Sequence, residues 1–465
     1  MTRIVLLATA FVAISIAVIA LRPAATPGPP ARDFEAYWAA GRTFNDRADA
    51  FGRSIWKAER SIGGVDSRRD EVLPFIGPPH TLLGWSLAAR LPYEAAVRLW
   101  LCILGVASLA LVGTVMYASG APPNASSFLA AVLLAIAFAP LSSDLALGQL
   151  ALVAFLGATF VSALADRWWV AAACAACVAF AQPNASLGLF SQLGRNRATL
   201  AIAVGAFTTY MLGALAAGWA WPLSYARAVS AHRLAEQFTA IQFDPASLAS
   251  ALGAPPDASR AISLIVAGLA IAAAIALIAR VRDSFARFGA CSALTPFVAG
   301  FFHEHDFIVA FAATLWCALR TNGTPRAIAL AGTLLVGIDW LGLAQRPTGI
   351  AQCALLAVAA CAAFLALGDR IERRRTIRIM MLVGALFAGA ATFAVHYPVP
   401  VWPDALGNLH VPPTATISAV WFEEQRASGL FSIVPAWSAL RSLSLLGCAL
   451  LAYAIYRHSS YCRTA

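Results

Sequence analysis

Asp33 is the side chain of this sequence best placed to do chemistry. It lies near the start of the first long polar stretch, 32–42, which follows closely on an apolar N-terminal run, 4–21. A carboxylate beside hydrocarbon is poorly solvated, and poor solvation raises its pKa. Such a group can accept a proton from an alcohol, as a general base in group transfer must. We therefore expect Asp33 to act as a general base, the alternative being that it only caps a helix that begins near Phe34.

Glu35 and Arg42 lie in the same polar stretch and are candidate substrate contacts. On an extended strand Asp33 and Glu35 would share one face, whereas on a helix their side chains diverge. A departing anionic group needs positive charge or hydrogen-bond donors across the site from the base. Arg42 is one candidate for that role, and two histidines far along the chain are the others.

Those histidines belong to a run of four ionisable residues, His303, Glu304, His305 and Asp306, between two apolar segments. Ionisable groups at membrane depth are costly and are usually functional. An imidazolium ion can bind a phosphate group, and His-x-His with flanking carboxylates is also a plausible set of metal ligands. We expect substrate or phosphate contact; a merely solvated loop and a metal site are the alternatives. We expect no metal and no cofactor.

Two further polar residues stand out between apolar runs. Gln149 lies in a short loop, 147–149, where its amide could hydrogen-bond a sugar hydroxyl. Asp339 lies near the end of an apolar run, 327–345, and either lines a cavity or reaches the membrane interface.

The composition indicates an integral membrane protein. The 465 residues are 60% hydrophobic and only 12% charged, whereas a soluble domain has roughly a quarter of its residues charged. The net charge of +10 does not indicate a nucleic-acid partner, because the arginines gather at the ends of apolar runs, as the positive-inside rule predicts. These arginines are Arg280, Arg282, Arg287, Arg370, Arg373, Arg374, Arg375, Arg378, Arg457 and Arg463.

Apolar runs recur along the whole chain, and several are short or broken. The run 168–192 is interrupted by Gln182 and Pro183. Irregular backbone at membrane depth is tolerated only against protein or a water-filled cavity. We therefore expect an all-α integral membrane bundle of about twelve crossings around a catalytic or transport cavity.

The arginine pattern also predicts sidedness. It places both termini in the cytoplasm and the polar segments 22–94, 218–260 and 397–436 on the outer side of the membrane. We expect one polytopic domain, 1–465, with helices of the outer loops lying on the membrane surface. The N-terminal run could instead be a signal peptide cleaved after Ala24 and Ala25, but we favour a retained span.

The segment from Asp33 to Arg42 resembles the DFxxYxxAG signature of glycosyltransferase family 87, bacterial membrane enzymes that use polyprenyl-phosphate sugars. Three later stretches resemble the family in the same order, and the similarity is best over residues 30–200. Two positions differ: Gly77 stands where the family often has tyrosine, and Gln182 where it often has lysine before proline. The later stretches are 75–92, 147–149 and 300–307.

The resemblance implies a GT-C fold, a multi-span helical bundle with periplasmic loop helices and a periplasmic active site. It implies a lipid-linked sugar donor of the polyprenyl-phosphate mannose or arabinose type, a glycan or glycolipid acceptor, and inverting transfer with Asp33 as the base. Tyr37, Gln149, His303 and His305 would line the cavity. A flippase or transporter for a lipid-linked glycan and a non-catalytic assembly subunit are the alternatives.

Overall fold

The computed structural model describes residues 3–21, 28–121, 124–346, 349–368, 371–432 and 434–464. These residues form helices and turns and contain no strand, which confirms the predicted all-α class. The alternative signal-peptide cleavage site at Ala24 and Ala25, the first residues of the predicted segment 22–94, and Arg370 lie outside the described residues.

Among the described residues, six helices are long and apolar enough to cross a membrane, so the protein is a multi-pass membrane protein. A seventh candidate is the pair α6 (Ala125–Ile136) and α7 (Ala139–Leu147), which is bent by 66°. The six are α1 with its π-helical extension η1 (Arg3–Ala20), α5 (Tyr93–Ala118), α11 (Asn196–Ala217), α14 (Pro256–Arg280), α20 (Arg373–His396) and α22 (Pro435–Thr464).

This number is below the predicted dozen crossings, because several apolar runs fold as short helices. The 14 residues of α8 (Ala151–Leu164) span roughly 21 Å, less than the ~30 Å hydrocarbon layer. The break expected at Pro183 is present, since α9 (Trp169–Ala179) ends before it and α10 (Pro183–Ser186) starts anew. The remaining helices of the bundle are η2 (Leu187–Gln192), α15 (Ser284–Ala293), η3 (Thr295–Phe297), η4 (His305–Ala310), α16 (Phe311–Arg320), α17 (Gly323–Gly337), α18 (Trp340–Gln345) and α19 (Ile350–Ala366).

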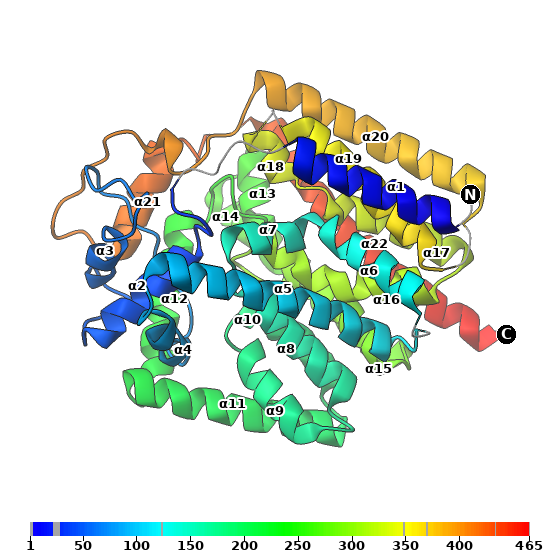
Figure 1. Ribbon diagram of the computed structural model, residues 1–465, viewed down its shortest axis with the longest axis horizontal. Helices are drawn as coiled ribbons and strands as arrows, with labels where there is room; N and C mark the ends of the chain where they lie inside the picture. Colours follow the sequence, from blue (N-terminus) through cyan, green and yellow to red (C-terminus); the bar gives the residue numbers. More distant parts are fainter. Residues whose placement is uncertain are drawn as a thin grey trace.

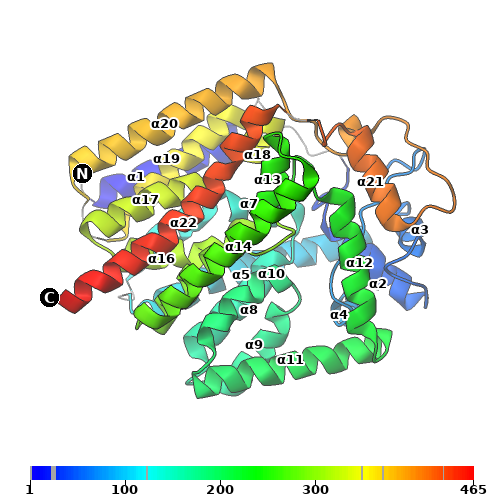
Figure 2. The ribbon, with the colours of Figure 1, turned by 180° about the vertical axis from the view of Figure 1, so that it is seen from behind.

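The helices of the long polar segments gather at one end of the bundle. Figure 1 shows α2, α3, α12 and α21 at this end, while the chain termini lie at the opposite end. The same separation is visible from behind in Figure 2. The arrangement agrees with the predicted grouping of the three polar segments on one side. Their helices are α2 (Phe34–Asn45), α3 (Ser54–Glu59), α4 (Thr81–Ala88), α12 (Trp221–Glu236), α13 (Pro245–Ala251), η6 (Asp404–Leu406) and α21 (Ile417–Ala427).

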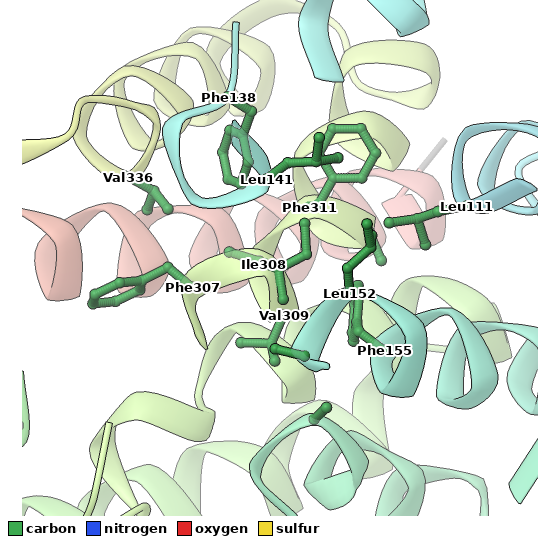
Figure 3. Close-up of a cluster of buried hydrophobic side chains, with 14 of the residues drawn as sticks. Leu111, Phe138, Leu141, Leu152, Phe155, Phe307, Ile308, Val309, Phe311 and Val336 are labelled. Carbon is green, nitrogen blue, oxygen red and sulfur yellow. The ribbon is translucent and has the colours of Figure 1, made fainter. Parts of the chain in front are cut away.

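The core of the bundle surrounds the segment that follows the predicted histidine run. Phe307, Ile308, Val309 and Phe311 are at most 1% exposed, and they pack among buried side chains of α5, α7, α8 and α17 (Figure 3). Burial of these apolar side chains fixes η4 and α16 inside the bundle. The ionisable residues 303–306, which lie just before and at the start of η4, are therefore anchored to the packed core.

Candidate active site

Asp33 lies immediately before α2, and its backbone contacts the last residue of α7. Its backbone N–H donates to the carbonyl oxygen of Leu147 (2.9 Å). The turn after α7 needs glycine: Gly148 has φ +72°, and a Cβ there would lie 2.8 Å from the Cβ of Ala31. The loop 147–149 is thus shaped to let the start of α2 approach closely.

The Asp33 carboxylate does not cap α2. Instead, the side-chain amide of Gln149 donates to Asp33 Oδ2. The hydroxyl of Tyr37 in turn donates to Gln149 Oε1 (2.7 Å). This chain of hydrogen bonds orients the carboxylate and leaves its other oxygen available to a ligand.

A cavity of about 520 Å³ lies beside Asp33, between the bundle and the outer loops. Five of the candidate site residues that the sequence predicted line this cavity. They belong to four places in the chain: the segment before α2, α2 itself, the loop between α7 and α8, and the segment around the start of η4. Asp339 lines the cavity as well, which favours the cavity-lining alternative for this residue. The five are Asp33, Tyr37, Gln149, His303 and His305.

His303 is bound by an acidic residue that the sequence did not single out. Its Nε2 lies 2.6 Å from Glu236 Oε1 at the end of α12. The other oxygen of Glu236 lies 3.2 Å from Nε2 of His232 and accepts a hydrogen bond from the indole of Trp421 on α21 (3.1 Å). Glu236, His232 and Trp421 also line the cavity.

Asp306 lies behind this wall of the cavity and supports it. Its Oδ2 accepts from the backbone N–H of His303 (3.0 Å), and its Oδ1 accepts from the amide of Gln182 (3.0 Å). Donor atoms of His303, His305 and Asp306 lie within 4.8 Å of one another, a spacing compatible with a metal ion. Because the Glu236 carboxylate favours the doubly protonated form of His303, which has no lone pair for a metal, and both oxygens of Asp306 accept hydrogen bonds, we do not identify these residues as metal ligands.

Besides Asp306, two further candidates do not line the cavity. Glu35 points away from it and forms a buried ion pair with Arg32 (3.1 Å), because on a helix its side chain diverges from that of Asp33. Arg42 lies two turns along α2 with its side chain 53% exposed, 4.0 Å from Asp46. Neither residue is part of the proposal below.

Asp33 and His303 carry opposite charges at neutral pH. Burial raises the pKa of Asp33 to about 6, although the hydrogen bond from Gln149 acts against the rise. Burial alone would lower the pKa of His303, but the Glu236 carboxylate outweighs it and raises that pKa to about 9. Burial lowers the pKa of His305 to about 4, so this ring is neutral. The cavity therefore presents a carboxylate base and an imidazolium ion.

Four residues that line the cavity were not predicted from the sequence: Glu236, Trp402, Trp421 and Arg346. The clearest signal available was the spacing of His232 and Glu236, four residues apart on one helix face. The neighbouring sequence does not show that this helix face is buried, because its partners are His303, just before η4, and Trp421 of α21.

Part of the chain is similar to a known protein family. Residues 75–300 match glycosyltransferase family 87. The matched region contains Gln149, Gln182 and Glu236; Asp33 precedes it and His303 follows it. No curated protein and no solved structure matches the chain. The match covers just under half of the chain, and together with the multi-pass helical fold it supports a membrane glycosyltransferase of family 87.

Proposed function

We propose that the protein transfers a sugar from a polyprenyl-phosphate donor to a hydroxyl of a glycan or glycolipid acceptor, with inversion and with Asp33 as general base. The observation that carries this proposal is the pairing of a carboxylate and an imidazolium ion on the walls of one buried cavity. The reaction takes place at the periplasmic face of the inner membrane. The side is supported by the arginine pattern and by the position of the outer-loop helices away from both termini.

In this reaction the acceptor oxygen attacks the anomeric carbon as the bond from that carbon to the phosphate oxygen breaks. Asp33 takes the proton of the acceptor hydroxyl. With a pKa of about 6, Asp33 is ionised at neutral pH and still basic enough to accept that proton. Gln149 keeps the carboxylate oriented from one side, which reduces the cost of reaching the reactive geometry.

The polyprenyl phosphate leaves with an additional negative charge. His303 is the cation of the cavity wall that meets this charge, and electrostatic stabilisation of a leaving group is worth most where water is excluded. The proposal needs no metal ion, since the imidazolium supplies the positive charge.

A second, apolar pocket supports a lipid-linked donor. It has a volume of about 320 Å³ and shares Pro78, Pro183 and Tyr225 with the polar cavity. Ala206 and Tyr210 of the candidate span α11 also line it. A hydrocarbon chain can therefore lie against α11 while its phosphate end enters the cavity, because apolar surface favours apolar chains.

Replacing Ala206 with tryptophan should fill the apolar pocket and weaken use of long-chain donors. We expect the KM for a long polyprenyl-phosphate sugar to rise about tenfold, because losing ~1.4 kcal/mol of chain contact, roughly two methylene groups, has this effect. A donor with one or two isoprene units should be affected less. Steady-state kinetics with both donors measure the difference.

The matched control is Val204→Trp, an exposed position of α11 that does not line the pocket. Equal effects of the two tryptophans on KM would contradict a lipid site in this pocket.

The rate of transfer should depend on pH with two limbs. Activity should fall below about pH 6, where Asp33 gains a proton and can no longer act as a base. It should also fall above about pH 9, where His303 loses its charge. The measurement is kcat/KM between pH 5 and 10, with intrinsic fluorescence recorded at each pH to show that the protein stays folded. Activity that keeps rising toward acid pH would contradict the role of Asp33.

The function itself is tested with purified protein in liposomes and radiolabelled polyprenyl-phosphate sugars. Appearance of label on a hydroxyl acceptor supports the proposed transfer, and we expect it to persist in excess chelator. Movement of the labelled lipid across the bilayer without transfer would indicate a flippase, and neither activity would indicate an assembly subunit.

A further inference from the structure

We propose that Glu236 is a positioning residue: it fixes the ring of His303 and keeps it charged, so that Nδ1–H faces the phosphate of the donor. This inference rests on the proposed function, because it assigns a task to the phosphate side of the same cavity. It adds a residue from α12, far in sequence from both Asp33 and the histidine run.

Both oxygens of the Glu236 carboxylate are held by protein groups. Oε1 lies 2.6 Å from His303 Nε2, and Oε2 contacts His232 Nε2 at 3.2 Å and the indole N–H of Trp421 at 3.1 Å. The side chain is 1% exposed. A carboxylate fixed in this way cannot rotate toward a ligand, so it acts through its neighbours.

The contact with Glu236 determines which nitrogen of His303 is available to a ligand. A carboxylate at 2.6 Å from Nε2 requires the proton on that nitrogen. The amide nitrogen of Gln242 also lies 2.8 Å from Nε2, but it is a donor and cannot accept this proton, because the Gln242 oxygen is turned to the backbone N–H of Phe302. Glu236 is therefore the acceptor for Nε2–H. Within the described part of the chain Nδ1 has no hydrogen-bond partner, and the His303 side chain is 19% exposed, to the cavity. Nδ1–H is therefore the donor left for an anion.

His305 provides an internal comparison for the charge of His303. Both rings line the cavity, and their centroids are 5.4 Å apart. The His305 ring makes no ion pair with Glu236, and burial lowers its pKa to about 4. The pKa of His303 is raised to about 9, with Glu236 the strongest contribution against burial. The contact with Glu236 thus accounts for the difference between the charged ring of His303 and the neutral ring of His305.

The remaining charged groups around His303 do not replace Glu236. Asp306 bonds the backbone N–H of His303 and the amide of Gln182. Asp33 must stay free to take the acceptor proton. His232 shares the Glu236 carboxylate from the same helix. Because His303, His232 and Trp421 cover both oxygens of Glu236, its negative charge is shielded from an incoming phosphate.

The test is a Glu236→Gln variant of the full chain in liposomes, assayed with a polyprenyl-phosphate sugar. The glutamine keeps the size of the side chain and can still accept from Trp421, but it removes the charge. We expect the alkaline limb of the pH profile to move down by roughly 1–3 pH units, the shift that a close opposite charge causes. At a fixed alkaline pH, kcat should fall more than KM rises, because the leaving phosphate gains charge in the transition state.

The matched control is Asp257→Asn, a fully exposed carboxylate at the start of α14, outside the cavity; its profile should equal that of the wild type. The Glu236→Gln change should add little on a His303→Gln background, because residues that act through one another are not additive. If Glu236→Gln does not accumulate in the membrane, Glu236→Asp replaces it. Its carboxylate lies farther from His303, so the limb must still move down, by less.

An unmoved alkaline limb in the variant that folds overturns the inference and leaves the proposed function intact, since the wild type would still transfer sugar. Full additivity with His303→Gln also overturns it. Absence of transfer by the wild type is the distinct result in which the proposed function fails and the inference falls with it.

Discussion

Replacing Asp33 with asparagine is expected to abolish sugar transfer while the protein still folds and reaches the membrane. Asparagine fills the same volume and can still accept a hydrogen bond from Gln149 through its carbonyl oxygen. It cannot take a proton from the acceptor hydroxyl. General-base catalysis contributes roughly 10²–10⁴-fold, so residual turnover should lie near the limit of a radiolabel assay.

The measurement is initial transfer rate at neutral pH, with the amount of protein determined by quantitative blotting and folding by thermal unfolding in detergent. Asp46→Asn is the matched control, because Asp46 lies at the other end of α2 with its side chain 67% exposed. Near-normal turnover by the Asp33 variant would remove this residue from the mechanism. Equal loss in both variants would indicate damage to α2.

The sequence singled out those cavity-lining residues that carry a local signal. Asp33 stands between a span and a polar stretch, Gln149 follows the glycine of a tight turn, and His303 lies in an ionisable run between apolar segments. Each pattern describes the immediate surroundings of the residue, and the cavity brings all three together. The all-α membrane class followed in the same way, because apolar content is a property of composition.

Residues whose role depends on tertiary contacts were missed or misplaced. Glu236 lies on a helix of low apolar content, and its burial depends on His303, which precedes η4, and on Trp421 of α21. Arg42 carries the expected charge, but the helix turns it away from the cavity. Fewer described helices are long enough to cross a membrane than the twelve crossings predicted, because run length alone does not show where a helix such as α8 ends inside the bundle.

Gln182 stands at the broken span, where the family often has lysine before proline. In the structure the amide of Gln182 instead binds Asp306, which holds the backbone of His303. A lysine at this place would bring a charge close to Asp306 and His303. The neutral Gln182 is thus compatible with a charged His303 in the same cavity wall. The cation of this wall is His303, just before η4, and not residue 182.

Replacing His303 with glutamine is expected to have the second largest effect. Glutamine keeps a hydrogen-bond donor near Glu236 but lacks the positive charge that should meet the leaving phosphate. Removing one such stabilising group typically costs about 10²–10³-fold in kcat. We expect this loss in kcat with a smaller change in KM, and we expect the alkaline limb of the pH profile to disappear, since the group that titrates near pH 9 is gone.

His305→Gln and His396→Gln separate this effect from general damage. His305 lines the same cavity but is neutral, so its loss should cost far less than that of His303. His396 is exposed at the end of α20 and does not line the cavity, and its ring contacts Thr392 and Tyr397, so its variant should behave as the wild type. If His303→Gln kept both its rate and its alkaline limb, the leaving phosphate would have to be stabilised by another group. Arg346 would then be the next residue to replace, because its guanidinium group lines the same cavity and can bind a phosphate.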